Sequence, residues 1–111
     1  MKGNFMLKPK SKKKMNPQEL GKIYKRQLDQ AKQEFEQLEF PCESEGGEVK
    51  VVLTGRREIK TLTLAPEIMQ GEKDRAEGLI IAVINQALTT VRDANIQLTD
   101  AVAKKFNAQY G

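Results

Sequence analysis

The spacing of hydrophobic and polar residues divides this chain into a helical segment, a strand-like segment and a second, longer helical segment. Over residues 20–38 apolar side chains return every three or four positions, as in an amphipathic helix. Asn16, Pro17 and Glu19 supply an N-cap, a proline at the first helical position and an acid at the third, so the helix is predicted to begin there. Pro41 is predicted to end it, because proline cannot donate to the helical ladder. The stripe consists of Leu20, Tyr24, Leu28, Ala31, Phe35 and Leu38.

The next segment changes to the two-residue alternation of β-strands. Residues 49–53 and 61–64 alternate on either side of a turn at 54–56, which predicts a hairpin. Residues 40–45 are predicted to add a short strand before the Gly46-Gly47 turn. The result is a three-stranded antiparallel meander with exposed edges.

The longest predicted element is a helix from about Lys73 to Phe106, which follows a short helical turn at 65–69 and a break at Gly71. At about 1.5 Å per residue its length is roughly 50 Å, whereas a 100-residue globule has a radius of gyration of about 13 Å. Its far end is therefore expected to overhang and to leave apolar surface that a second copy covers, which predicts a homodimer. Its apolar positions are Leu79, Ile80, Val83, Ile84, Ala87, Leu88, Val91, Ala94, Leu98, Val102 and Phe106.

These elements make an α+β fold with an N-terminal helix, a three-stranded antiparallel sheet, a short helical turn and a long C-terminal helix. A chain of 111 residues with 39% hydrophobic side chains fits one ordinary domain. We assign that domain to residues 16–111 and expect residues 1–15 to form a disordered basic arm.

Charge is distributed unevenly. The first sixteen residues contain six lysines and no acid, while the whole chain has 19 basic and 15 acidic residues and a net charge of +4. A basic arm on a near-neutral or acidic body is typical of a protein that touches a polyanion, because lysines gain affinity by releasing counterions from phosphates. A solubilising tail without a partner is the competing interpretation.

The predicted phosphate contacts lie in this arm and in the first helical turns. Lys22, Lys25 and Arg26 fall within one turn beside the arm and extend its basic surface. Arg56 with Arg57, and Lys104 with Lys105, are weaker candidates because each pair is isolated in sequence. The predicted contacts are Lys8, Lys10, Lys12, Lys13, Lys14, Lys22, Lys25 and Arg26. No base-reading motif is present, so weak sequence preference and strong salt dependence are expected.

The inventory of catalytic residues is poor. The chain has no histidine, and its single cysteine, Cys42, is interpreted as a strand residue, so the usual zinc sites and Ser-His or Cys-His arrangements are excluded. Paired acids such as Glu34 with Glu36 are interpreted as solvated surface. We expect no catalytic residue, no metal and no cofactor. No apolar run approaches the ~20 residues that span a bilayer, so a cytoplasmic protein without a membrane partner is expected.

Several segments in this order resemble the YbaB/EbfC family of bacterial nucleoid-associated proteins. The resemblance rests on Glu43 to Val51, Thr54-Gly55, Leu62 to Met69, and Leu79 to Ala87. It implies a tweezer-like two-fold dimer that binds DNA in the nucleoid without catalysis and with low sequence specificity, compacting DNA or modulating gene expression. The chain departs from the family pattern at Ala65, where an acid is common, at Gly78, where the family tends to be acidic, and at Leu88 to Thr90, where basic residues are common.

A second hypothesis comes from a different functional class. The helical stripes also suit a dimeric protein-interaction module, an adaptor or chaperone-like protein, whose basic tail only aids solubility. RNA is an alternative polyanionic partner to DNA, because phosphate contacts alone scarcely distinguish the two.

Overall fold

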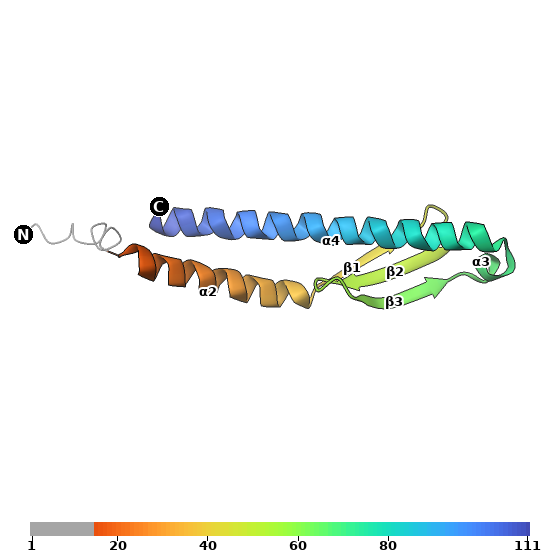
Figure 1. Ribbon diagram of the computed structural model, residues 1–111, viewed down its shortest axis with the longest axis horizontal. Coiled ribbons are helices and arrows are strands. Elements are labelled where there is room, and N and C mark those ends of the chain that lie inside the picture. Colours follow the sequence, from red (N-terminus) through yellow and green to blue (C-terminus); the bar gives the residue numbers. More distant parts are fainter. Residues whose placement is uncertain (1–14) are drawn as a thin grey trace, which may run out of the picture. The chain divides into compact units, whose positions relative to one another are not determined.

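The computed structural model describes residues 15–111 and has the predicted α+β order of elements (Figure 1). The lysines predicted to bind phosphate at positions 8–14, and nearly all of the predicted disordered arm, lie outside the described residues. The elements are α2 (Pro17–Glu36), β1 (Glu39–Glu43), β2 (Val49–Thr54), β3 (Ile59–Leu64), α3 (Pro66–Gln70) and α4 (Lys73–Tyr110).

The described chain forms two compact units. The helical unit comprises residues 15–32 and 98–111, that is, most of α2 and the last part of α4. The sheet unit comprises residues 33–97 and contains the strands, α3 and the first part of α4.

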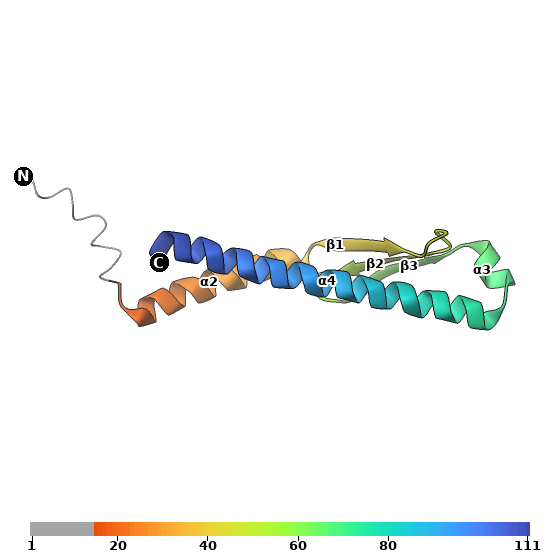
Figure 2. The same cartoon turned by 90° about the horizontal axis from the view of Figure 1, so that it is seen from above.

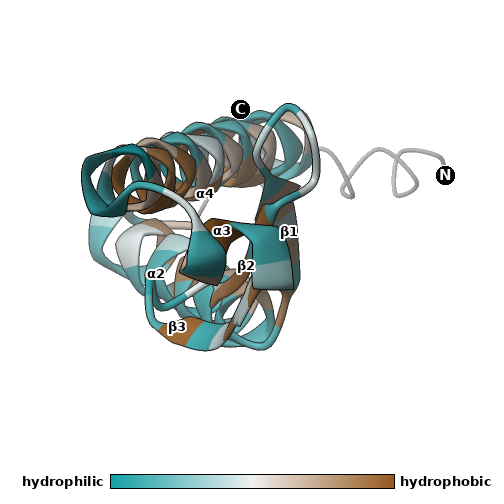
Figure 3. Ribbon diagram, turned by 90° about the vertical axis from the view of Figure 1, so that its right-hand side faces the viewer, coloured by the Kyte–Doolittle hydropathy of each residue, from teal (hydrophilic) through white to brown (hydrophobic). Residues whose placement is uncertain are grey.

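The core of the sheet unit lies between β2 and α4. The strands pair antiparallel in the order β1-β2-β3. Val49, Val51 and Leu53 alternate along β2 and are fully buried, because one face of the sheet lies under α4 (Figure 3). The helix contributes Val83, Ala87 and Val91 at steps of four residues, and α3, which connects β3 to α4 (Figure 2), adds Ile68.

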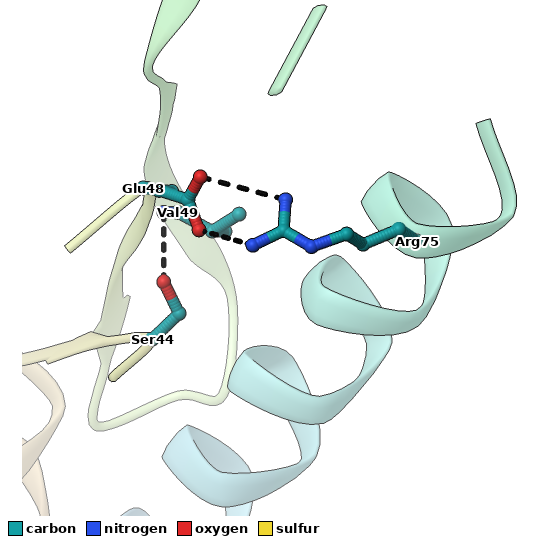
Figure 4. A network of polar contacts seen from close by, with 4 residues as sticks. All are labelled: Ser44, Glu48, Val49 and Arg75. Atoms are coloured by element: carbon teal, nitrogen blue, oxygen red, sulfur yellow. Dashed lines mark hydrogen bonds and ion pairs between the residues drawn. The ribbon is translucent and has the colours of Figure 1, made fainter. Parts of the chain in front are cut away.

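A polar network fastens the first turn of α4 to the start of β2 (Figure 4). The guanidinium of Arg75 donates to both carboxylate oxygens of Glu48, at 2.7 and 3.4 Å, and the amide of Val49 donates to the buried Ser44 Oγ at 3.0 Å. The hydrogen bond to Glu48 raises the pKa of Arg75. A raised pKa favours the charged form, so this contribution to stability is complete below the ordinary pKa of arginine and is lost only as the pH rises above it.

Gly55 permits a close approach between the loop after β2 and the end of α2. A Cβ atom at this position would lie 2.0 Å from the carbonyl oxygen of Phe35 and 2.7 Å from its carbonyl carbon. The Gly55 amide also donates to the carbonyl of Leu38 at 3.1 Å. Only glycine fits here without moving the backbone of its neighbour. Two residues further on, Arg57 adopts a left-handed conformation with φ of 66°.

Pro41 does not end α2, and this prediction was wrong. The helix ends at Glu36, where the Gln37 and Leu38 amides turn back to the carbonyls of Glu34 and Phe35 at 3.1 and 3.0 Å. Leu38 therefore leaves the predicted stripe and is 51% exposed. Pro41 instead lies in β1 opposite Val52. The sheet tolerates it because β1 is an edge strand, where a missing amide donor does not interrupt a second ladder.

Other boundaries differ by a few residues. The first strand covers Glu39–Glu43 rather than 40–45, and β3 begins at Ile59, ahead of the predicted 61–64. A register shift near Val52 and Leu53 accommodates one extra residue of β3. The last helix continues four residues past Phe106, to Tyr110.

Candidate nucleic-acid interface

Aromatic side chains join α2 and α4 in the helical unit. The rings of Tyr24 and Phe106 meet edge to face with centroids 5.1 Å apart, and Tyr110 stacks on Phe106 at 5.0 Å. The side-chain amide of Gln27 donates to Gln109 Oε1 at 3.1 Å. The first turns of α2 and the last turns of α4 therefore lie side by side. Phe106, at the end of α4 that was predicted to be covered by a second copy, packs instead on Tyr24 of the same chain.

The start of α2 is fixed by the predicted capping box. The Glu19 amide donates to Asn16 Oδ1 at 2.8 Å, and the Asn16 amide donates to Glu19 Oε1 at 3.3 Å. Pro17 occupies the first helical position. The sequence thus places the lysine-rich residues immediately before a defined helix end in the helical unit.

The three described residues of the predicted phosphate site all lie exposed on α2. Lys22 and Arg26 are four residues apart and share a helical face. Neither forms an ion pair with any residue between 15 and 111. Lys25 differs, because its Nζ lies 2.9 Å from Asp29 Oδ2, which neutralises part of its field. Lys22 and Arg26 are therefore the stronger candidates on this helix.

A second pair of lysines joins them from the other helix. Lys104 and Lys105 are exposed near Phe106, and no ion pair in the described part of the chain involves them. Because Phe106 packs on Tyr24, the helix that carries these lysines is the direct neighbour of α2. Sequence reasoning ranked the pair low as isolated. The apolar stripes of α2 and of the last turns of α4 are the sequence signal that could have predicted this pairing of helices, and with it the position of Lys104 and Lys105 beside α2.

The two units differ in the sign of their charge. The helical unit has six basic and three acidic residues, a net charge of +3, while the sheet unit has seven basic and twelve acidic residues, a net charge of −5. The tail lysines precede the positive unit in sequence. Positive charge suited to a polyanion is thus concentrated on the helical unit.

The described residues offer little for other chemistry. Between residues 15 and 111, no group of three or more cysteine or acidic side chains is placed to hold a metal ion. No helix in the same range is both long and apolar enough to cross a membrane.

Comparisons with known proteins agree with this architecture. A model of the YbaB/EbfC DNA-binding family matches residues 12–106. A nucleoid-associated protein of Acinetobacter baumannii is 36% identical over 94 residues, which cover 85% of this chain and 83% of the relative. A nucleoid-associated protein of a Psychrobacter species is 40% identical over 62 residues, 56% of each chain. An uncharacterized protein from Helicobacter pylori shares the fold with a TM-score of 0.70 at 18% identity, covering 80% of this chain and 98% of that one.

Proposed function

Since this chain belongs to the YbaB/EbfC DNA-binding family, we propose that it is a non-catalytic, nucleoid-associated protein that binds DNA in the bacterial cytoplasm. The observation that carries the proposal is the separation of charge between the two units. A net +3 on the helical unit, preceded by the tail lysines, attracts phosphate, whereas a net −5 on the sheet unit repels it. DNA is therefore expected to approach the helical unit.

Binding follows from phosphate neutralisation. Each lysine or arginine that meets a phosphate releases condensed counterions, which gives affinity without reading the base sequence. The described contacts come from two adjacent helices, Lys22, Lys25 and Arg26 from α2 and Lys104 and Lys105 from α4. The tail lysines Lys8, Lys10, Lys12, Lys13 and Lys14 complete the proposed set. Compaction of DNA and effects on gene expression are expected consequences where one assembly binds two stretches of duplex.

Paired substitutions in the two units test this assignment. The variants Lys22→Gln/Arg26→Gln and Lys104→Gln/Lys105→Gln each remove two charges from the helical unit. The control Lys50→Gln/Lys73→Gln removes two charges from exposed positions of the sheet unit. In fluorescence anisotropy against duplex DNA, the log–log salt slope should fall by about 0.9 for each phosphate that the first two variants no longer neutralise, and it should not change in the control. Equal slopes in all three would contradict the assignment, and a parallel titration with duplex RNA shows whether the site prefers one polymer.

We further propose that the protein is a homodimer assembled through its sheet unit. Leu62 pairs with Val51 in register and so shares the core face of the sheet, yet 43% of it is exposed, because α4 covers β2 more fully than β3. Ile81 of α4, in the same unit, is 59% exposed. A second copy that covers Leu62 of β3 and Ile81 of α4 would complete the core.

A further inference from the structure

One cluster of positive charge lies outside the helical unit, on the otherwise acidic sheet unit. Arg57, Leu88, Thr89 and Arg92 line a surface hollow of about 320 Å³. Arg57 comes from the loop between β2 and β3, and the other three residues from successive turns of α4. Two arginines far apart in sequence and one threonine therefore line the same hollow.

The acids nearest in sequence do not occupy this hollow. Glu58 approaches Arg56 instead, with 4.0 Å between its Oε1 and the Arg56 Nε. Asp93 lies 3.7 Å from the Nε atom of Arg92, and it does not line the hollow. No carboxylate lines the hollow, and Arg57 forms no ion pair with a described residue. Within the hollow, Arg57 therefore carries a positive charge without an ion pair to a described residue, while Arg92 shares its charge with Asp93, which does not line the hollow.

The backbone of Arg57 adds an independent observation. Its φ of 66° lies in the left-handed region, which is unfavourable for a residue other than glycine. Glycine would remove that cost, yet the loop holds an arginine there. Hydrogen bonds keep it in place, since the Arg57 amide donates to the Thr54 carbonyl at 2.9 Å and the Thr54 amide donates to the Glu58 carbonyl at 2.9 Å. Held in this conformation, Arg57 lines the hollow together with Leu88, Thr89 and Arg92 of α4.

We propose that Arg57 and Arg92, with the hydroxyl of Thr89, bind one phosphate group of the DNA backbone. Guanidinium groups suit this ligand because their planar donors match phosphate oxygens in pairs, and a hydroxyl supplies a further donor. This inference rests on the proposed DNA-binding function and adds to it a contact on the sheet unit.

Single substitutions in the full chain test the proposal, with Arg56 as the matched control. Arg57→Gln and Arg92→Gln should each lower the salt slope of duplex DNA binding by about 0.9 for every hollow that no longer binds a phosphate. Arg56→Gln removes the same charge from the same loop but does not line the hollow, so its slope should match the unsubstituted chain. The variant Arg57→Gly shows whether weaker DNA binding comes from the lost charge or from a loss of folding. Glycine tolerates the positive φ, so the melting temperature should rise, while DNA binding should still weaken because the charge is gone.

The outcomes distinguish this proposal from the broader one. If the unsubstituted chain binds DNA and Arg57→Gln and Arg92→Gln behave like Arg56→Gln, the hollow is not a DNA contact, although the proposed function stands. If inorganic phosphate shifts the NMR signals of the Arg57 and Arg92 side chains while their substitution leaves the DNA slope intact, the hollow is a small-anion site and the proposal is overturned. If the unsubstituted chain does not bind DNA at all, the proposed function fails, and this inference fails with it.

Discussion

Two glycines, the half-buried Gly55 and the exposed Gly78, have opposite roles. A Cβ atom at Gly55 would collide with the backbone of Phe35, while one at Gly78 meets nothing within 4 Å. Gly55→Ala should therefore destabilise the protein by about 3 kcal/mol, as forced overpacking does. Gly78→Ala should stabilise it by about 0.5–1 kcal/mol, because glycine is unfavourable inside a helix. Urea unfolding of both variants checks the contrast, and a neutral Gly55→Ala would show that the loop does not lie against α2 as described.

Hydrogen bonds and ion pairs between individual residues could be predicted where the two residues are close in sequence. The capping box of Asn16 and Glu19 spans three residues, so its hydrogen bonds could be anticipated. The pairing of Lys25 with Asp29 was also visible as a spacing of four residues, although the sequence interpretation left all three α2 cations equal. The hollow between Arg57 and Arg92 could not be predicted, because it depends on where the loop before β3 meets α4.

The start of α2 depends on its cap. Asn16→Ala removes the acceptor of the Glu19 amide and should cost about 1 kcal/mol of stability, whereas Asn16→Asp keeps an acceptor and should cost little. Thermal unfolding followed by circular dichroism at 222 nm measures both. Identical melting temperatures for Asn16→Ala and the unsubstituted chain would mean that the box does not hold the helix end.

The elements themselves followed from hydrophobic spacing, and the errors cluster where one residue allows two interpretations. Pro41 can stop a helix or occupy an edge strand, and the choice depends on the pairing of β1 with β2, which no local signal reveals. The end of α2 at Glu36 is likewise set by contacts of the β2–β3 loop with Phe35. Long, regular elements such as α4 were placed correctly to within a few residues at their ends.

The proposed dimer predicts a specific weak point on β3. Leu62→Lys places a charge on the incompletely covered core face, so it should raise the dimer dissociation constant at least about tenfold, equivalent to ~1.4 kcal/mol. Met69→Lys is the control, because Met69 is 69% exposed on α3. Sedimentation velocity over a concentration series separates monomer from dimer, and circular dichroism confirms that both variants fold. Unchanged association of Leu62→Lys would place the interface elsewhere.

At the level of the complete chain, the sequence located the excess positive charge but not its division between folded units. The tail lysines are evident from composition alone. The acids of residues 33–97 can be counted in the sequence, but that Lys104 and Lys105 lie beside α2 emerges only from the packing of α4 on α2 in the structure. The folded arrangement therefore adds a two-helix basic surface to the predicted arm.

The most direct test of phosphate-driven DNA binding compares the full chain with a version lacking residues 1–14. Both are titrated with a fluorescent duplex by anisotropy across a range of salt concentrations. Phosphate-driven binding should give a steep salt slope for the full chain, near −0.9 per phosphate contact. The shortened chain should show a flatter slope and residual binding from Lys22, Arg26, Lys104 and Lys105. Absence of binding by the full chain near physiological salt would contradict phosphate-driven DNA binding and favour a protein partner for the exposed apolar residues Leu62 and Ile81.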